Sequence, residues 1–509
     1  MWDGIATGLS TVLVPTNLML VVGGCIAGTF IGMLPGLGPI SAIALMIPIT
    51  YGFDPASGMI LMAGVYYGAI FGGSTSSILV NAPGVAGTVA TSFDGYPMAC
   101  AGKAGKALAI AAVASFAGGT IAAVLLMLAA PALATVSLSF QSPDYLMLMI
   151  LGLTAVSAFA SRGHVLQALI TTVIGLMLST VGTDPSAGIQ RFTFGSLDLV
   201  DGLSFLLLAM ATFALSEALM SVLKGGESST QSGEVETSEI GSLHISKADA
   251  RQMAPVIGRS SILGFFVGVL PGAGATIASF LAYGMERAIA TVKEKLQFGK
   301  GSIRGLTAPE AANNAACTGS FVPLLTLGIP GSGTTAVMLG ALISYGVQPG
   351  PQLFHNNPEV FWAVIISMYI GNVVLLILNL PLIPYIARLL ALPRQLLLPL
   401  ILFFSLIGVY LVSFNTFDIR LMSGFAVAAV FLRLFDYPMA PLILGFILGG
   451  MMEDNLQRTM TLYDGSFSFL WQRPVSLGIT ILLIFVILVP AVRTLRDYAS
   501  RRRSDVQPN

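Results

Sequence analysis

The sequence predicts an all-α polytopic integral membrane protein, and its composition, hydropathy and long apolar stretches all favour this fold class. Of its 509 residues, 55% are apolar and only 9% are Asp, Glu, Lys or Arg, whereas a water-soluble chain carries about 25% charged residues. The mean hydropathy is +0.86. A soluble fold of this length cannot hide so much apolar surface, so we expect the chain to lie in a lipid bilayer.

The composition also argues against several soluble function classes. The net charge is zero, so nucleic acid would find no basic surface to bind. The three cysteines (Cys25, Cys100 and Cys317) are far apart and form neither a disulfide framework nor a metal cluster. Phosphate-binding and hydrolase motifs such as Walker A, GxGxxG and GxSxG are missing from the sequence. We therefore expect a protein that is not an enzyme and has no cofactor.

Stretches of about 20 apolar residues predict the membrane helices. They lie at 104–135, 144–161, 165–182, 203–222, 360–390, 395–414, 419–435 and 475–492. Two further regions, 12–91 and 257–347, are apolar but interrupted by Gly and Pro. With the segments of these regions included, we expect about 11 to 13 membrane segments in all. The polar stretch 224–256 predicts a cytoplasmic linker between a first membrane repeat, 1–223, and a second, 257–492. Residues 493–509 are expected to form a basic cytoplasmic tail.

Two motifs recur in the two interrupted regions. The sequence GMLPGLG at 32–38 matches GVLPGAG at 268–274, an offset of 236 residues, and NAPG at 81–84 matches GIPG at 328–331, an offset of 247 residues. Two unusual motifs in the same order indicate an internal repeat. We expect their prolines and glycines to break the membrane helices. These helix-breaking residues are Pro35, Gly36, Gly38, Pro83, Pro271, Gly272, Gly274 and Pro330.

The charged loops predict that the two repeats have inverted topology. After the first motif, loop 51–57 has no Lys or Arg, whereas 287–304 in the second half carries five. After the second motif the bias reverses, because Lys103 and Lys106 belong to the first half and 346–359 has no Lys or Arg. Basic loops stay cytoplasmic, so equivalent loops lie on opposite sides, as in inverted repeats with Gly/Pro-broken helices or hairpins. Ser57, Gln352 and the N-terminus are then external, and the C-terminus is cytoplasmic.

Polar residues beside the second motif are the candidate binding site. Paired broken helices indicate a transport site near the bilayer midplane, where helix N-termini suit carboxylates and hydroxyl or amide oxygens suit a hard cation such as sodium. The candidate substrate-binding residues are Ser74, Thr75, Ser76, Asn81, Gly84, Asn313, Asn314, Gly331, Ser332, Gly333, Thr334 and Thr335. Of these, the expected sodium ligands are Ser76, Asn81, Asn314 and Thr335.

A packing interpretation of the same residues stays open. Small Ser, Thr and Gly side chains also permit close approach of membrane helices without binding any ligand. Two further amides, Asn372 and Asn379, are expected to make hydrogen bonds between helices.

The long motifs resemble those of a known family. The sequence PEAANNAA at 309–316, which continues to PLLTLGIPGSGT at 323–334, resembles the signature of the large permease subunit of tripartite tricarboxylate transporters. The motifs at 32–38 and DGYPMA at 94–99 resemble the same family. The likeness spans nearly the whole chain in order and spacing. Cys100 departs from the pattern, because a basic residue is expected there, and this departure bears only on local loop contacts.

The resemblance implies a permease of the bacterial inner membrane that works with two partners. One is a small four-helix membrane subunit, and the other is a periplasmic binding protein that delivers a carboxylate. Uptake would be driven by an ion gradient, with sodium as the coupling ion of the citrate system, and an elevator-like motion would move the broken segments. Two alternatives remain, namely a stand-alone ion-coupled carboxylate carrier, and a channel or membrane-embedded enzyme. A channel needs a continuous polar path, which the sequence does not display.

Overall fold

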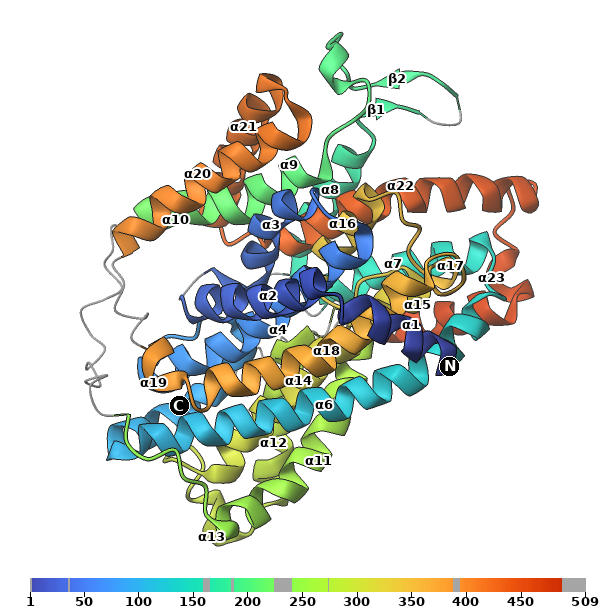
Figure 1. Ribbon diagram of the computed structural model, residues 1–509. Helices are drawn as coiled ribbons and strands as arrows, with labels where there is room; N and C mark the ends of the chain where they lie inside the picture. Colours follow the sequence, from blue (N-terminus) through green and yellow to red (C-terminus); the bar gives the residue numbers. More distant parts are fainter. Residues whose placement is uncertain are drawn as a thin grey trace, which may run out of the picture. The chain divides into compact units, whose positions relative to one another are not determined.

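The computed structural model is helical almost throughout, which confirms the all-α class (Figure 1). It describes residues 2–34, 37–158, 165–184, 187–223, 240–272, 274–387 and 394–487. Six of the described helices are long and apolar enough to cross a membrane, so the chain is a polytopic membrane protein. Two short strands, β1 (Gly182–Thr183) and β2 (Gln190–Arg191), pair antiparallel.

The helices up to residue 223 include two 3-10 turns, η1 and η3, and two π-helical turns, η2 and η4. In order they are α1 (Trp2–Val12), α2 (Pro15–Met33), α3 (Gly38–Thr50), α4 (Pro55–Leu79), η1 (Ala86–Thr88), α5 (Val89–Met98), η2 (Ala99–Lys103), α6 (Ala104–Ser137), α7 (Ser142–Ala158), α8 (Val165–Ser179), η3 (Leu197–Leu199), α9 (Phe205–Ala209), η4 (Met210–Leu215) and α10 (Ser216–Leu223).

The later helices begin with α11 at Lys247, which lies within the polar stretch 224–256 that was predicted to be a linker. In order they are α11 (Lys247–Val269), α12 (Gly274–Ile289), α13 (Val292–Lys295), α14 (Ile303–Gly319), α15 (Phe321–Leu327), α16 (Gly333–Ser344), α17 (Pro351–Asn356), α18 (Pro358–Asn379), α19 (Ile383–Ile386), α20 (Arg394–Ser413), α21 (Thr416–Leu434), α22 (Met439–Leu462) and α23 (Phe469–Gln472). A last apolar helix spans Pro474–Ile487.

One predicted membrane helix needs correction, and one further helix was not predicted. The stretch 360–390 is not one span, because α18 ends at Asn379 and the chain turns before Pro381 and Pro384, which cannot continue a helix without losing backbone hydrogen bonds. The 24-residue helix α22 was missed, because Glu453, Asp454 and Arg458 lower the hydropathy of its second half.

The chain forms two compact units. Unit 1 comprises Met1–Leu138 and Leu203–Phe435, and unit 2 comprises Ser139–Gly202 and Asp436–Asn509. In unit 2, the buried Asp144 of α7 accepts hydrogen bonds from Arg473 at 2.7 Å and from Ser476 at 2.5 Å. Arg473 and Asp144 therefore form an ion pair within this unit. Residues 224–239 and 493–509 lie outside the described residues, and the predicted division into 1–223, 224–256, 257–492 and 493–509 stays a prediction.

Unit 1 is built around α4, which is buried along nearly its whole length. Glycines let α2 cross α4 at backbone distance, because a Cβ atom on Gly28 or Gly32 would overlap the carbonyl group of Val65 or Ala69. Small residues at membrane helix crossings permit this close packing.

The crossing of α11 and α14 repeats this contact in the second half. There, Gly264 and Gly268 lie against the carbonyl groups of Ala312 and Ala316. The four residues correspond to those of the α2–α4 crossing by the offsets of 236 and 247 residues that the motifs define.

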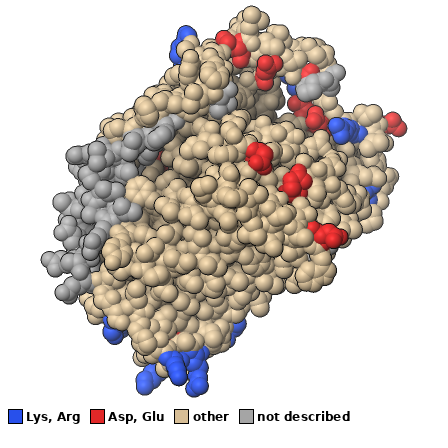
Figure 2. All heavy atoms as spheres, viewed as in Figure 1, with Lys and Arg blue, Asp and Glu red and all other residues tan. Residues whose placement is uncertain are grey.

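The surface of unit 1 has a broad uncharged region. Figure 2 shows Lys and Arg side chains gathered at the end where α13 lies, and no charged side chain over α2 and the middle of α6 and α18 in this view. These helices also expose large apolar side chains, including Met19 and Ile26 of α2, Leu128 of α6 and Ile377 of α18. Such a surface is suited to contact with lipid.

Candidate functional site

The first motif ends a helix in the same way in both halves. Leu34 caps α2 and Leu270 caps α11, each in an extended conformation and each with its N–H bonded to a carbonyl three residues earlier. Gly38 and Gly274 then begin the next helices with φ of 63° and 58°, a left-handed conformation that glycine adopts without steric cost. Pro35 and Gly36 lie outside the described residues, whereas Pro271 and Gly272 form the turn after α11.

The second motif breaks a helix at matched positions as well. Asn81 has φ of 51° just after α4, and Gly328 has φ of 69° just after α15. The chain then passes through Pro83 and Pro330, which both lie between helices.

The two motifs of each half pack against each other. A Cβ atom on Gly84 would overlap the carbonyl oxygen of Gly32, and one on Gly331 would lie 2.9 Å from the carbonyl oxygen of Gly268. The breaks of each half are therefore in backbone contact. Neither Gly84 nor Gly331 has a positive φ. Glycine is therefore required at these positions because a side chain would have no space.

The residues after Pro330 form the N-terminus of α16. Ser332 is the N-cap, and its side chain and that of Thr335 form a reciprocal capping box. Thr334 and Thr335 are buried, whereas Ser332 and Gly333 are half-buried. The first amide groups of the helix and its positive dipole end therefore lie directly at the break.

The paired amides lie in the middle of α14, facing the first half of the chain. Asn313 donates to the carbonyl oxygen of Gly87 at 3.2 Å, and Asn314 donates to the side-chain oxygen of Asn313 at 2.7 Å. Both are fully buried, and the side-chain oxygen of Asn314 has no hydrogen-bond partner within the described part of the chain. An acceptor of this kind is free to contact a cation or a donor group.

The first half has tyrosines where the second half has these amides. By the offset of 247 residues, Tyr66 and Tyr67 correspond to Asn313 and Asn314. The Tyr67 hydroxyl donates to Thr318 at 2.7 Å, and the Tyr66 hydroxyl lies 3.4 Å from the Ser332 hydroxyl. The matched helices thus carry different chemistry, and the site is asymmetric.

A buried carboxylate that sequence reasoning missed lies beside the serines of α4. Glu310 accepts hydrogen bonds from Ser74 at 2.8 Å, from Ser115 at 2.7 Å and from Thr91. The signal was present in the sequence, because an ionisable residue within an apolar membrane region is itself an indication of function.

The other predicted site residues have separate partners. Ser76 accepts from the Gly84 amide at 3.1 Å, which ties α4 to the break, Thr75 is buried beside a small cavity, and Asn81 is exposed. Between the described side chains, no hydrogen bond joins Ser76, Asn81, Asn314 and Thr335 to one another, so the predicted sodium ligands remain a prediction.

The predicted packing amides behave differently from expectation. The Asn379 side chain donates to Leu375 of its own helix, and neither polar atom of the Asn372 side chain has a partner among the described residues. The expected hydrogen bonds between helices are therefore not formed within the described ranges. Both residues are nevertheless buried.

Contacts at the ends of unit 1 bring loops from the two halves together. Asp94 accepts hydrogen bonds from the amides of Gly299, Gly301 and Ser302 at 2.7 to 2.9 Å, and Lys106 forms an ion pair with Asp249 at 2.8 Å. The basic segment that follows the second motif in the first half therefore lies beside the basic segment that follows the first motif in the second half. The segments without basic residues also meet, because the rings of Tyr51 and Tyr345 lie 5.8 Å apart.

Comparison with known proteins gives one family. The profile of the Tripartite tricarboxylate transporter TctA family matches residues 18–444. An uncharacterized 52.8 kDa protein in the TAR-I ttuC' 3' region of Agrobacterium vitis is 40% identical over 498 residues, covering 97% of this chain and 98% of that protein. An uncharacterized protein in the TAR-II ttuC' 3' region of the same organism is 41% identical over 239 residues, covering 46% of this chain and 97% of that protein. No solved structure matches the chain.

Proposed function

Because this chain belongs to the Tripartite tricarboxylate transporter TctA family and is thus a membrane component of a transporter, we propose that it takes up a tricarboxylate or related carboxylate by ion-coupled secondary transport. The observation that carries the proposal is the packing of two helix breaks against each other in each half, Gly84 on Gly32 and Gly331 on Gly268. Paired breaks of this kind accompany transporter sites near the membrane midplane. The N-terminus of α16 offers amide groups to an anionic substrate.

Sodium is the coupling ion in this proposal. The second motif is rich in hydroxyl and amide oxygens, which are the ligands of hard cations, and the side-chain oxygen of Asn314 is buried with no partner in the described structure. The sequence has no nucleotide-binding motif, so an ion gradient and not ATP would drive uptake. Ser76, Asn81, Asn314 and Thr335 remain the predicted ligands.

The proposed setting is the bacterial inner membrane, with two partner proteins. Membership of the tripartite family implies a periplasmic binding protein that captures the carboxylate and a small four-helix membrane subunit. The broad apolar surface of unit 1 leaves room for lipid and for a helical subunit (Figure 2).

Reconstitution tests this function. Proteoliposomes that contain the chain and its small subunit should accumulate radiolabelled citrate or another carboxylate only when an inward sodium gradient is imposed and the binding protein is added. Liposomes with potassium in place of sodium are the control. Full uptake by the purified chain alone would instead identify a stand-alone carrier, and uptake that needs ATP but no gradient would contradict the proposal.

We further propose that the two halves are inverted repeats and that the broken segments move in an elevator-like manner. The proposal is supported by the matched contacts of Gly28 and Gly264 and by the matched helix caps of Leu34 and Leu270. It is also supported by two contacts between the halves. The basic segments that follow different motifs meet at Asp94 and Gly299, and the segments without Lys or Arg meet at Tyr51 and Tyr345. In this orientation the N-terminus is periplasmic and the C-terminus is cytoplasmic.

Cysteine labelling tests the topology. Ser57 is only 4% exposed, so Gly52, which is exposed in the same loop, is the better position. In a chain without native cysteines, Gly52→Cys and Gln352→Cys should react with an impermeant maleimide added to intact cells. Lys103→Cys and Lys300→Cys should react only after the membrane is opened. Labelling of Gly52→Cys and Gln352→Cys from opposite sides would contradict the inverted repeat.

A further inference from the structure

The Glu310 carboxylate lies in a cage of hydroxyl groups from three other segments. It is 0% exposed, and its hydrogen-bond donors are Ser74 of α4, Thr91 of α5 and Ser115 of α6. All three donors are neutral. Salt bridges within the described ranges do not include this carboxylate.

Charged groups on the surrounding helices already have other partners. Lys106 of α6 pairs with Asp249 of α11, Arg304 of α14 pairs with the fully buried Glu286 of α12, and Asp94 of α5 binds backbone amides. A negative charge in the protein interior is costly unless a positive charge compensates it. The buried carboxyl group is therefore neutralised either by a proton or by a cation that no described residue provides at this place.

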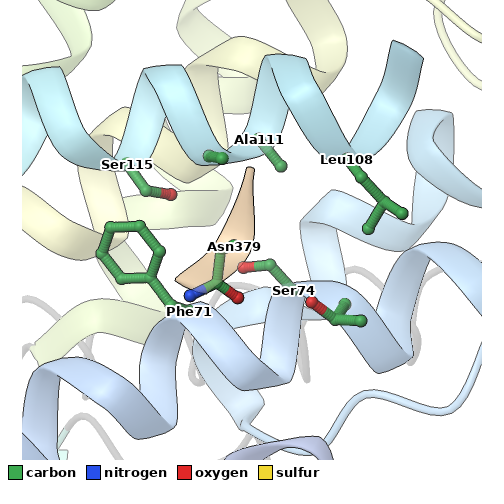
Figure 3. A pocket seen from close by; sticks show the side chains of 8 residues that line it. Phe71, Ser74, Leu108, Ala111, Ser115 and Asn379 are labelled. Atoms are coloured by element: carbon green, nitrogen blue, oxygen red, sulfur yellow. The ribbon is translucent and has the colours of Figure 1, made fainter. Parts of the chain in front are cut away.

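A small cavity lies next to the hydroxyl cage. Its volume is about 10 Å³, which is room for one water-sized particle. Figure 3 shows the side chains of Ser74, Ser115 and Asn379 around it. The remaining lining residues are Phe71, Thr75, Leu108, Ala111 and Ala112.

Asn379 contributes an oxygen that has no partner. The residue is 4% exposed, and its side-chain nitrogen donates to the Leu375 carbonyl oxygen at 3.0 Å. This bond fixes the amide orientation, since a carbonyl oxygen would repel the amide oxygen. The oxygen of Asn379 is buried and accepts no hydrogen bond from the described residues.

We propose that this cavity is a sodium site, in which Ser74, Ser115 and Asn379 are ligands and Glu310 supplies the compensating negative charge. Ser74 and Ser115 direct their hydroxyl protons at the carboxylate, so their lone pairs remain available on the other side. Together with the Asn379 oxygen they form a set of neutral oxygen ligands beside one negative charge, which suits a small hard cation. The inference rests on the proposed sodium coupling and places an ion apart from the ligands predicted near the second motif.

The polarity of the site favours a cation over an anion or a water molecule. One N–H of the Asn379 amide is bonded to Leu375, the hydroxyl protons of Ser74 and Ser115 point at Glu310, and the negative charge of Glu310 would repel an anion. A water molecule could donate two hydrogen bonds but would leave the charge of Glu310 uncompensated.

Direct binding of ²²Na⁺ to the purified full-length chain tests the site without requiring transport. In sodium-free buffer with constant ionic strength, the wild-type chain should bind ²²Na⁺ in a form that excess NaCl displaces and KCl does not. Asn379→Leu, Ser115→Ala and Glu310→Gln should each lower the sodium affinity at least tenfold. Asn372→Leu is the matched control, because Asn372 lies two turns earlier on the same helix, is also buried and also lacks a partner among the described residues, and it should bind like the wild type.

The possible outcomes separate this site from the proposed function. Wild-type sodium affinity in both Asn379→Leu and Ser115→Ala would overturn the site, even if sodium-driven uptake is intact. Stabilisation of the wild type by acidic pH but not by sodium would also overturn it, in favour of a proton on Glu310. Sodium binding that these substitutions weaken, in a chain that transports no carboxylate, would uphold the site and reject the proposed function. Thermal unfolding of each variant distinguishes lost binding from lost fold, and the mild Ser115→Ala change keeps the test decisive if Glu310→Gln does not fold.

Discussion

Replacing Gly32 with alanine is expected to destabilise unit 1 by about 1 to 3 kcal/mol, the usual cost of overpacking a well-packed interior. The added Cβ atom would overlap the carbonyl oxygen of Ala69 on α4. The oxygen is a backbone atom and the backbone fixes the direction of the Cβ atom, so neither can rotate away. The matched substitution Gly268→Ala should have a similar effect, because its Cβ atom would overlap the carbonyl oxygen of Ala316. Since Gly84 packs on Gly32, the first helix break should be displaced as well.

The measurement is thermal unfolding in detergent, followed with a thiol-reactive dye. Cys25 and Cys317 are buried and Cys100 is exposed, so a Cys100→Ser background reports only the exposure of buried thiols on unfolding. Gly23→Ala is the matched control on the same helix, because a Cβ atom there meets nothing within 4 Å. It should be stabilising by about 0.5 to 1 kcal/mol through helix propensity. Equal unfolding temperatures for Gly32→Ala and Gly23→Ala would refute the close crossing.

Replacing Asn313 or Asn314 with alanine is expected to raise the half-saturating concentration of substrate or sodium about ten- to a hundredfold. A lost hydrogen bond to a charged group in a dry site costs about 1.5 to 3 kcal/mol. Both amides are fully buried beside the broken segments, and Asn314 retains an acceptor that no described residue uses. The protein should still reach the membrane, since α14 continues unbroken through both positions.

Uptake in proteoliposomes, titrated separately with carboxylate and with sodium, measures this effect. Asn372→Ala is the control, because this buried side chain makes no hydrogen bond to the described residues and its removal breaks none. Its transport should depend on both ligands as the wild type does. If Asn313→Ala and Asn314→Ala leave both dependences unchanged while Asn372→Ala abolishes transport, the binding site lies on other helices.

Properties that depend on local sequence could be predicted well. Helix breaks follow from the restricted backbone of proline and the freedom of glycine, so the positive φ values of Gly38 and Gly274 occur at matched motif positions. The predicted end of the span 360–390 was wrong. The sequence stays apolar beyond Asn379, but the helix ends there because Pro381 cannot continue it.

The sequence by itself determined the fold class, the pairing of the motifs and the places where helices break, because apolar content and backbone preference are properties of short segments. Only the tertiary structure decided which side chains meet. The donors to Glu310 lie 236, 219 and 195 residues away in the sequence, and the free oxygen of Asn379 comes from yet another helix. Such contacts depend on how glycine-lined helices cross, and side-chain packing between distant segments sets that geometry.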